Sequence, residues 1–173
     1  MRVVFLGSGA EQLPVELLAA ILKRRGHEVR LVFDPSLFDD HFHTQIPTLA
    51  RWFRRDEQLV DDAVALRPDV IAMSALTGTY RWGLAMATEI KRRTGAKVIF
   101  GGVHPSAVPD TVIAEPSVDA ICVGEGDFAF PEYVDALERN RLRTPIANLW
   151  FKREDGVVVR GPQSGFVQDL DAL

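Results

Sequence analysis

The sequence predicts a doubly wound α/β domain with a five-stranded parallel sheet and a small β-hairpin near its carboxyl end. Short, continuous apolar runs alternate with segments of helical periodicity, as in buried parallel strands joined by crossover helices. Glycine, small or hydroxyl residues follow these runs directly, as is typical of strand ends at one edge of a sheet. The length of 173 residues, 47% of them hydrophobic, suffices for one such core.

The amino-terminal segment predicts a strand, a helix and a second strand. β-Branched and aromatic residues indicate a buried strand over Arg2–Leu6. Pro14 favours the first turn of a helix, and apolar residues at helical spacing continue it to Arg25, before Gly26 ends it. A second strand follows over Glu28–Phe33. This order and length are those of a βαβ unit.

The middle of the chain continues this alternation after a long, irregular connection over residues 34–47. The handedness of crossovers leaves few topologies for such a chain, and we expect the strand order of flavodoxin. The predicted strands are Asp69–Met73, Lys97–Phe100 and Asp119–Val123. The predicted helices are Leu49–Leu66, Tyr80–Arg93, Asp110–Ala114 and one that follows residues 124–127 and runs to about Arg139.

Beyond Asn140 the pattern changes. Residues 148–152 and 157–160 flank an Asp-Gly turn and predict a β-hairpin. Residues 161–173 show no periodicity and indicate a connector. We therefore expect a domain over residues 1–140, and a hairpin with a connector over residues 141–173.

Charge and cysteine content exclude several function classes. A net charge of -4 and a pI near 5.6 argue against a general affinity for nucleic acid or anionic membranes. Cys122 is the only cysteine, which leaves no disulfide and no cluster of thiolate ligands. The sequence shows neither a signal peptide nor an apolar run long enough to span a bilayer, and we expect a cytoplasmic protein.

Four loops rich in glycine and small residues should meet at the carboxyl ends of the strands: residues 7–13, 74–79, 101–109 and 124–127. Their composition predicts a cradle for a large cofactor and no catalytic residue. The pair Gly101-Gly102 removes side chains where a flat ligand can approach the backbone.

Common ligands of such folds match these loops poorly. Gly7 and Gly9 begin a dinucleotide fingerprint, but Gln12 stands at its third glycine position. The hydroxyl residues Thr77 and Thr79 follow the third strand, whereas flavodoxins carry a hydroxyl-rich phosphate loop after the first. A nucleotide- or nucleotide-sugar-binding domain stays open as an alternative, as does a docking module without a cofactor.

Four segments together resemble the cobalamin-binding domain that precedes the radical S-adenosylmethionine domain of cobalamin-dependent radical enzymes. The resemblance covers roughly residues 1 to 140, and residues 17–34 are similar to the same family. The segments are Ser74-x-Leu76-Thr77, Phe100-Gly101-Gly102-Val103-His104-Pro105-Ser106, Val118-Asp119-Ala120 and Val123-Gly124-Glu125-Gly126-Asp127.

The resemblance implies that the dimethylbenzimidazole tail of cobalamin enters the sheet between the first and third strands, beside Ser74. The Gly101-Gly102 pair and the turn at His104 would line the tail and the corrin edge, and residues 124–126 would close the far side. The implied cofactor-binding residues are Ser8, Gly9, Ala10, Glu11, Gln12, Leu13, Ser74, Leu76, Thr77, Gly78, Gly101, Gly102, Val103, His104, Pro105, Gly124, Glu125 and Gly126.

One departure concerns the lower face of cobalt. Many cobalamin domains place Asp-x-His-x-x-Gly after the first strand, but residues 7–13 contain no histidine. The resemblance then implies a displaced tail and no histidine ligand from this loop, with Gln12 or Leu13 near the lower face. His41 and His43 have no third ligand beside them in the sequence, so we expect no metal site there.

The same resemblance implies a cobalamin-binding module of an enzyme that performs methyl transfer or radical rearrangement. S-adenosylmethionine and a 4Fe-4S cluster would belong to a radical domain absent from this chain, because one cysteine cannot ligate the cluster. That domain would lie in the same full-length protein or in a separate subunit. We expect the present chain to bind its cofactor without catalysing a reaction.

Overall fold

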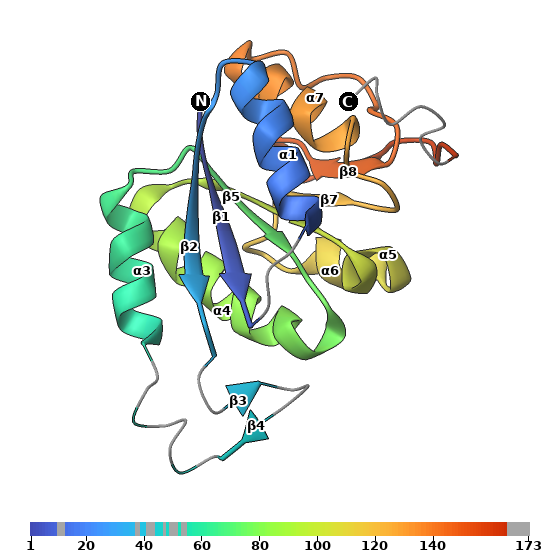
Figure 1. Cartoon of the computed structure of the whole chain (residues 1–173). Helices are drawn as coiled ribbons and strands as arrows, with labels where there is room; N and C mark the ends of the chain where they lie inside the picture. Colours follow the sequence, from blue (N-terminus) through green and yellow to red (C-terminus); the bar gives the residue numbers. More distant parts are fainter. Residues whose placement is uncertain are drawn as a thin grey trace.

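A seven-stranded sheet runs through the centre of the computed structural model (Figure 1). The structure describes residues 1–9, 13–36, 39–40, 44–46, 48, 52 and 55–165. Across the sheet the parallel strands follow the order β2-β1-β5-β6-β7, which confirms the predicted flavodoxin-type order. These strands are β1 (Arg2–Ser8), β2 (Glu28–Asp34), β5 (Val70–Ser74), β6 (Lys97–Gly101) and β7 (Ala120–Cys122).

The carboxyl-terminal hairpin extends this sheet, whereas the sequence indicated five strands with a hairpin beside them. Its strands are β8 (Leu149–Lys152) and β9 (Val158–Arg160). β8 pairs antiparallel with β7, so that Phe151 lies opposite Ala120, and β9 forms the new edge. The hairpin thereby covers the backbone groups that β7 would otherwise expose at the end of the parallel sheet.

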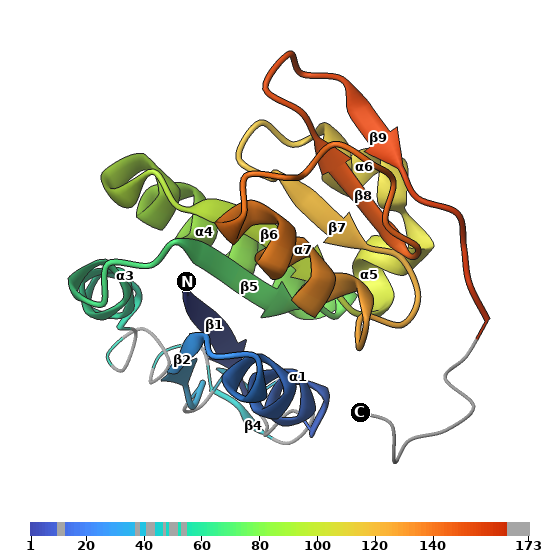
Figure 2. The same cartoon turned by 90° about the horizontal axis from the view of Figure 1, so that it is seen from above.

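Helices cover both faces of the sheet, as a doubly wound fold requires (Figure 2). On one face, α1 (Leu13–Arg24) and α7 (Ala129–Glu138) pack on alternate strand residues such as Val3 and Phe5. On the other face, α3 (Asp56–Ala65), α4 (Thr77–Thr94) and α6 (Pro109–Ala114) pack on residues such as Val4 and Leu6. None of the helices in the described segments is long and apolar enough to cross a membrane.

The structure corrects several expected boundaries. α4 begins at Thr77, three residues before the expected start, because the Thr79 hydroxyl accepts a hydrogen bond from the Leu76 backbone and caps the first turn. Residues Val103–Ala107 form the short helix α5 where a loop was expected. Within the irregular connection, β3 (Asp39–Asp40) pairs with β4 (Thr44–Gln45). The first part of the helix expected over 49–66 lies mostly outside the described residues, as do His41 and His43.

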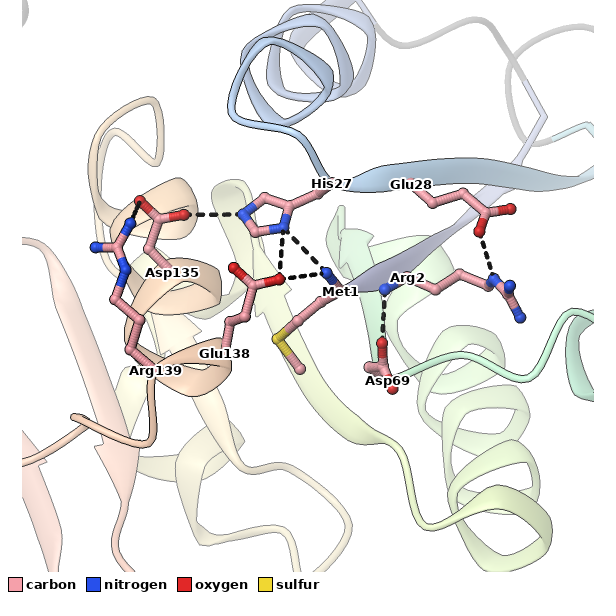
Figure 3. Close-up of polar contacts among 8 residues, drawn as sticks. All are labelled: Met1, Arg2, His27, Glu28, Asp69, Asp135, Glu138 and Arg139. Atoms are coloured by element: carbon pink, nitrogen blue, oxygen red, sulfur yellow. Dashed lines mark hydrogen bonds and ion pairs between the residues drawn. The ribbon is translucent and has the colours of Figure 1, made fainter.

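A charged cluster joins the amino-terminal ends of the strands to α7 (Figure 3). The His27 side chain is buried, and its Nε2 donates a hydrogen bond of 2.8 Å to Oδ1 of Asp135. The Met1 ammonium donates to Glu138 at 2.8 Å and to Nδ1 of His27 at 3.2 Å. Beside them, the Arg2 guanidinium forms an ion pair with Glu28. The cluster stabilises the edge of the sheet opposite the strand ends where ligands bind in this fold class.

Candidate functional site

A cavity of about 1050 Å³ opens at the carboxyl ends of β1, β5, β6 and β7. Ligand cavities in proteins commonly measure about 300–1,000 Å³, so this one suits a large ligand. It lies at the edge of the sheet where the sequence predicts the four glycine-containing loops to meet.

The floor of the cavity is apolar. Phe5, Ala72, Ile99 and Cys122, one residue from each of these four strands, all face α1 and α7. Phe130 of α7 completes the floor, and its ring stands edge-on to Phe5 with the centroids 5.7 Å apart. Burial raises the pKa of the Cys122 thiol to about 12, so the thiol stays neutral at physiological pH. A flat, apolar ring fits this floor better than a charged group does.

The cavity extends to the point where β1 and β5 stop pairing. Their ladder contains three residue pairs and ends at Phe5 with Ala72, although β1 continues to Ser8 and β5 to Ser74. In this strand order, the direction of winding reverses between these two strands, and ligands bind at such switch points. The cavity therefore has the position that the fold class assigns to a cofactor.

Serine hydroxyls join the loops around the cavity mouth. The Ser8 and Ser36 hydroxyls are 2.7 Å apart, which links the end of β1 to the loop after β2. The Ser106 hydroxyl donates to the carbonyl of Gly102 at 2.8 Å and accepts from the amide of Gly124 at 2.9 Å. These bonds hold the walls of the mouth in a fixed geometry before a ligand arrives.

The two adjacent glycines after β6 have different roles. Gly102 has a φ of +93°, and a Cβ there would lie 2.9 Å from Oγ of Ser74 and 3.0 Å from the amide nitrogen of Ala75. Its missing side chain thus lets the loop pack on the end of β5. A Cβ on Gly101 would contact only Cys122, at an ordinary 3.6 Å, on the cavity side of the sheet. The space that a ligand can use is therefore at Gly101.

His104 lies outside the cavity wall. Its ring packs against Tyr80 with the centroids 4.2 Å apart, and its Nδ1 is 3.3 Å from the Thr77 hydroxyl. Its backbone amide donates to the carbonyl of Ala75. No histidine occurs among the described residues that line the cavity, and the described part of the chain contains no group of three potential metal ligands.

The charge at the mouth is negative on one side. Glu125 and Asp127 both line the cavity beside α7. Partial burial raises the pKa of Asp127, and the charge of Glu125 raises it further. None of the described lining residues is Lys or Arg. The mouth thus favours hydrogen-bond donors such as amides and disfavours a polyphosphate.

Exposed apolar side chains form part of the rim. Leu13, Leu76 and Val103 line the cavity although they are 74%, 44% and 65% exposed. They come from the starts of three helices and surround the same opening. An apolar rim of this kind marks a surface that a ligand or a partner covers.

The structure brings most of the expected site residues together. Thr77, Gly78, His104 and Pro105 do not line the cavity. Thr77 and Gly78 are exposed in the first turn of α4, His104 packs on Tyr80, and Pro105 is buried within α5. Ala10, Glu11 and Gln12 lie outside the described residues. Those that line the cavity are Ser8, Gly9, Leu13, Ser74, Leu76, Gly101, Gly102, Val103, Gly124, Glu125 and Gly126.

Sequence reasoning missed most of the cavity floor and part of its walls. Alternation along the strands was a usable signal, since alternate strand residues share a face. No local signal indicated Ser36, whose place depends on the contact between two loops. The lining residues outside the four predicted loops are Phe5, Pro14, Leu18, Ser36, Ala72, Met73, Ile99, Cys122 and Phe130. Thr79, Ser106, Ala107 and Asp127 lie in those loops but were not among the implied cofactor-binding residues.

Comparison with known families gives a match over most of the chain. Residues 3–134 match the family described as "B12 binding domain". An uncharacterized methyltransferase of Pyrococcus horikoshii is 26% identical over 170 residues, which are 97% of this chain and 33% of that protein. The cytidylyl-2-hydroxyethylphosphonate methyltransferase of Streptomyces wedmorensis is 20% identical over 88% of this chain. The chain spans about a third of the length of these curated relatives.

Solved structures share the fold. The radical S-adenosylmethionine methyltransferase TsrM of Kitasatospora setae, with cobalamin and a 4Fe-4S cluster bound, has a TM-score of 0.70 at 20% identity. The similarity covers 98% of this chain and 30% of TsrM. The cobalamin-dependent S-adenosylmethionine radical enzyme OxsB, with aqua-cobalamin bound, has a TM-score of 0.68 at 16% identity over 95% of this chain and 22% of OxsB.

Proposed function

Because the chain belongs to the B12-binding domain family, we propose that its cavity holds the dimethylbenzimidazole tail of cobalamin, with the corrin at the mouth. The observation that carries this proposal is the cavity of about 1050 Å³ at the switch point of the sheet. Its apolar floor suits the heterocycle of the tail, while the hydroxyl groups and backbone at its mouth suit the phosphate and amide groups of the cofactor.

The apolar rim supports the same arrangement. A corrin lying over Leu13, Leu76 and Val103 would remove three exposed apolar side chains from water. The acidic side of the mouth, at Glu125 and Asp127, would accept hydrogen bonds from the corrin amides. A nucleotide or nucleotide sugar, in contrast, would bring its phosphates next to these carboxylates with no described Lys or Arg on the wall.

We propose further that the lower face of cobalt receives no histidine ligand from this chain. Support comes from His104, which contacts Tyr80 and Thr77 outside the wall, and from the absence of histidine in residues 7–13. The predicted proximity of Gln12 or Leu13 to the lower face stays a prediction: Gln12 lies outside the described part, and Leu13 lines the cavity. The walls must then hold the cofactor by packing and hydrogen bonds.

For the whole protein, we propose a cobalamin-dependent radical S-adenosylmethionine methyltransferase, with the radical domain in the same full-length protein or in a separate subunit. The two related methyltransferases and TsrM support the methyl transfer, and TsrM and OxsB support the combination of cobalamin with S-adenosylmethionine radical chemistry. Bound cobalamin would supply a cobalt centre for group transfer, and the described residues would bind and orient it. A radical rearrangement and a cytoplasmic location also stay predictions.

The test is retention of cobalamin by the purified chain. After mixing with hydroxocobalamin and removal of free ligand, the visible spectrum should show retained corrin without the bands of histidine-ligated cobalt. Gly101→Leu, which places a side chain in the cavity, should weaken retention at least about 10-fold, as expected for a close-contact site. Ala65→Leu on the exposed face of α3 is the matched control and should bind normally.

The sole cysteine gives a second readout at the site itself. Cys122 lies in the cavity floor, so bound cobalamin should slow its modification by a small thiol reagent, measured at alkaline pH because the raised pKa of the thiol keeps the reactive thiolate scarce at neutral pH. Retained corrin with an unchanged modification rate would place the cofactor elsewhere. A colourless protein that binds a nucleotide tightly would favour the nucleotide-binding alternative, and one that binds neither would favour a docking module.

A further inference from the structure

Asn148 joins the last described segment, residues 161–165, to the body of the domain. Its Oδ1 accepts a hydrogen bond of 2.8 Å from the Ser164 amide, and its Nδ2 donates to the Ser164 hydroxyl at 2.8 Å. Its own amide donates to the carbonyl of Pro162 at 2.9 Å. Residues 161–165 are the described part of the connector predicted over residues 161–173, and below "the connector" means these five residues. Three hydrogen bonds that involve Asn148 therefore hold the connector against the domain.

The same asparagine also holds the loop that follows β7. Its Nδ2 donates to the carbonyl of Glu125 at 3.3 Å, and its backbone carbonyl accepts from the amide of Val123 at 2.8 Å. Glu125 and its neighbours Gly124 and Gly126 line the cavity. Asn148 thus contacts a cavity wall on one side and the connector on the other.

The local packing shows that this junction has a defined geometry. Asn148 is only 6% exposed and has a φ of +58°, a conformation that asparagine tolerates better than most residues. A Cβ on Gly161 would overlap the carbonyl of Ile146, so the connector approaches residues 146–149 as closely as a backbone can. A small cavity of about 230 Å³, lined by Glu125, Asn148 and Ser164 among others, lies between the two segments.

We propose that Asn148 is a positioning residue that couples the cofactor-binding loop over residues 123–126 to the connector. This inference rests on the proposed binding of cobalamin. Because Asn148 bonds to both segments, a ligand that orders the loop also orders the connector, and release of the connector loosens the loop. Coupling of this kind is reciprocal between two sites.

The decisive variant is Asn148→Gly, because glycine keeps the left-handed backbone available and removes only the side-chain bonds. Without cofactor, amide exchange should accelerate at least about 5-fold in both segments, as expected for loss of buried hydrogen bonds. The Kd for hydroxocobalamin should rise by about 5- to 10-fold. In the unmodified chain, cobalamin should slow exchange in the connector by at least about 5-fold, and in Asn148→Gly it should not.

Asn140→Gly is the matched control. Asn140 also has a positive φ, of +51°, but it is exposed at the end of α7, so both measurements should stay unchanged. Ser164→Ala removes a single hydroxyl from an exposed residue, and it should produce a smaller change in the same direction if Asn148→Gly fails to fold.

Two results would overturn the coupling: normal cobalamin affinity in Asn148→Gly, or unchanged connector exchange when the spectrum shows bound corrin. Failure of the unmodified chain to bind cobalamin would instead contradict the proposed function. The exchange rates of the cofactor-free variants would then still decide whether Asn148 holds the two segments together.

Discussion

Gly102 and Gly101 are neighbours in the chain, but they face different surroundings. The positive φ and the short distance to Ser74 make Gly102 a requirement of the fold. Gly101 has an ordinary backbone and faces the cavity, so under the proposed function the bound cofactor is what requires a glycine there. Gly102 therefore serves the stability of the fold, and under the proposed function its neighbour Gly101 serves binding.

The roles of Gly101 and Gly102 can be distinguished by substituting alanine at each position. Gly102→Ala should lower the free energy of unfolding by about 1–3 kcal/mol, because it combines a strained φ with a contact near 3 Å. Gly101→Ala should change it by less than about 0.5 kcal/mol, because its Cβ meets only an ordinary contact. Urea denaturation of both variants measures the difference, and equal losses would contradict the separate roles.

The sequence indicated that the glycine pair lies at the ligand site and where the loops lie. It could not show that the two glycines have different roles. That division depends on φ at Gly102 and on the distance to Ala75, which lies in a loop far away in the chain. His104 shows the same limit. The motif placed it among the ligand contacts, whereas packing on Tyr80 turns its ring away from the cavity.

At the scale of elements, the hairpin β8–β9 is an integral part of the sheet. Phe151 is fully buried against the same apolar cluster that contains the cavity floor. The alternation of apolar and polar residues in the hairpin could be recognised in the sequence. Its pairing with β7 could not, because strand pairing depends on contacts between residues far apart in the chain. The start of α4 was similarly missed because it depends on a cap formed by Thr79.

Truncation of Phe151 tests this integration. Phe151→Ala should lower the free energy of unfolding by about 3–5 kcal/mol, the usual cost of removing a buried aromatic side chain. Val157→Ala, at a half-exposed position before β9, should cost less than about 0.5 kcal/mol. Comparable small effects in both variants would show that the hairpin packs loosely on the domain.

At the scale of the whole molecule, the two edges of the sheet at which the parallel strands begin and finish differ chemically. The carboxyl ends of the strands surround the cavity, and the amino ends carry the charged cluster of His27, Asp135 and Glu138 (Figure 3). The alternation of apolar runs with helical segments was enough to predict where the cavity lies, since all the parallel strands finish at that edge of the sheet. The charged cluster at the opposite edge depends on contacts between residues far apart in the chain, such as His27 and Asp135, which are 108 residues apart. No local sequence pattern indicates such contacts.

The charged cluster predicts a pH dependence. Burial alone would raise the pKa of Asp135, but hydrogen bonds from His27 and Arg25 outweigh it and lower the pKa below its ordinary value of 3.8. The charged carboxylate therefore stabilises the fold above pH 3.8, and this contribution is lost as the pH falls through the lowered pKa. Asp135→Asn should lower the free energy of unfolding at pH 7 and make little difference well below the lowered pKa.

Urea denaturation across this pH range is the measurement. Asp61→Asn, which removes a surface ion pair with Arg93, is the control and should change stability by less than about 1 kcal/mol at either end of the range. A loss in Asp135→Asn that stays constant down to the lowest pH would show that the charge of Asp135 is not the cause.

The separation of the two ends also bears on how such a domain can diverge. The central strand β5, with five residues, spans about 13 Å from its amino end beside the charged cluster to its carboxyl end at the cavity, at about 3.3 Å per residue. Substitutions farther apart than about 10 Å usually combine additively. In an evolving lineage, substitutions in the charged cluster can therefore change thermal stability, and substitutions at the cavity mouth can change corrinoid specificity, with little epistasis between the two sets.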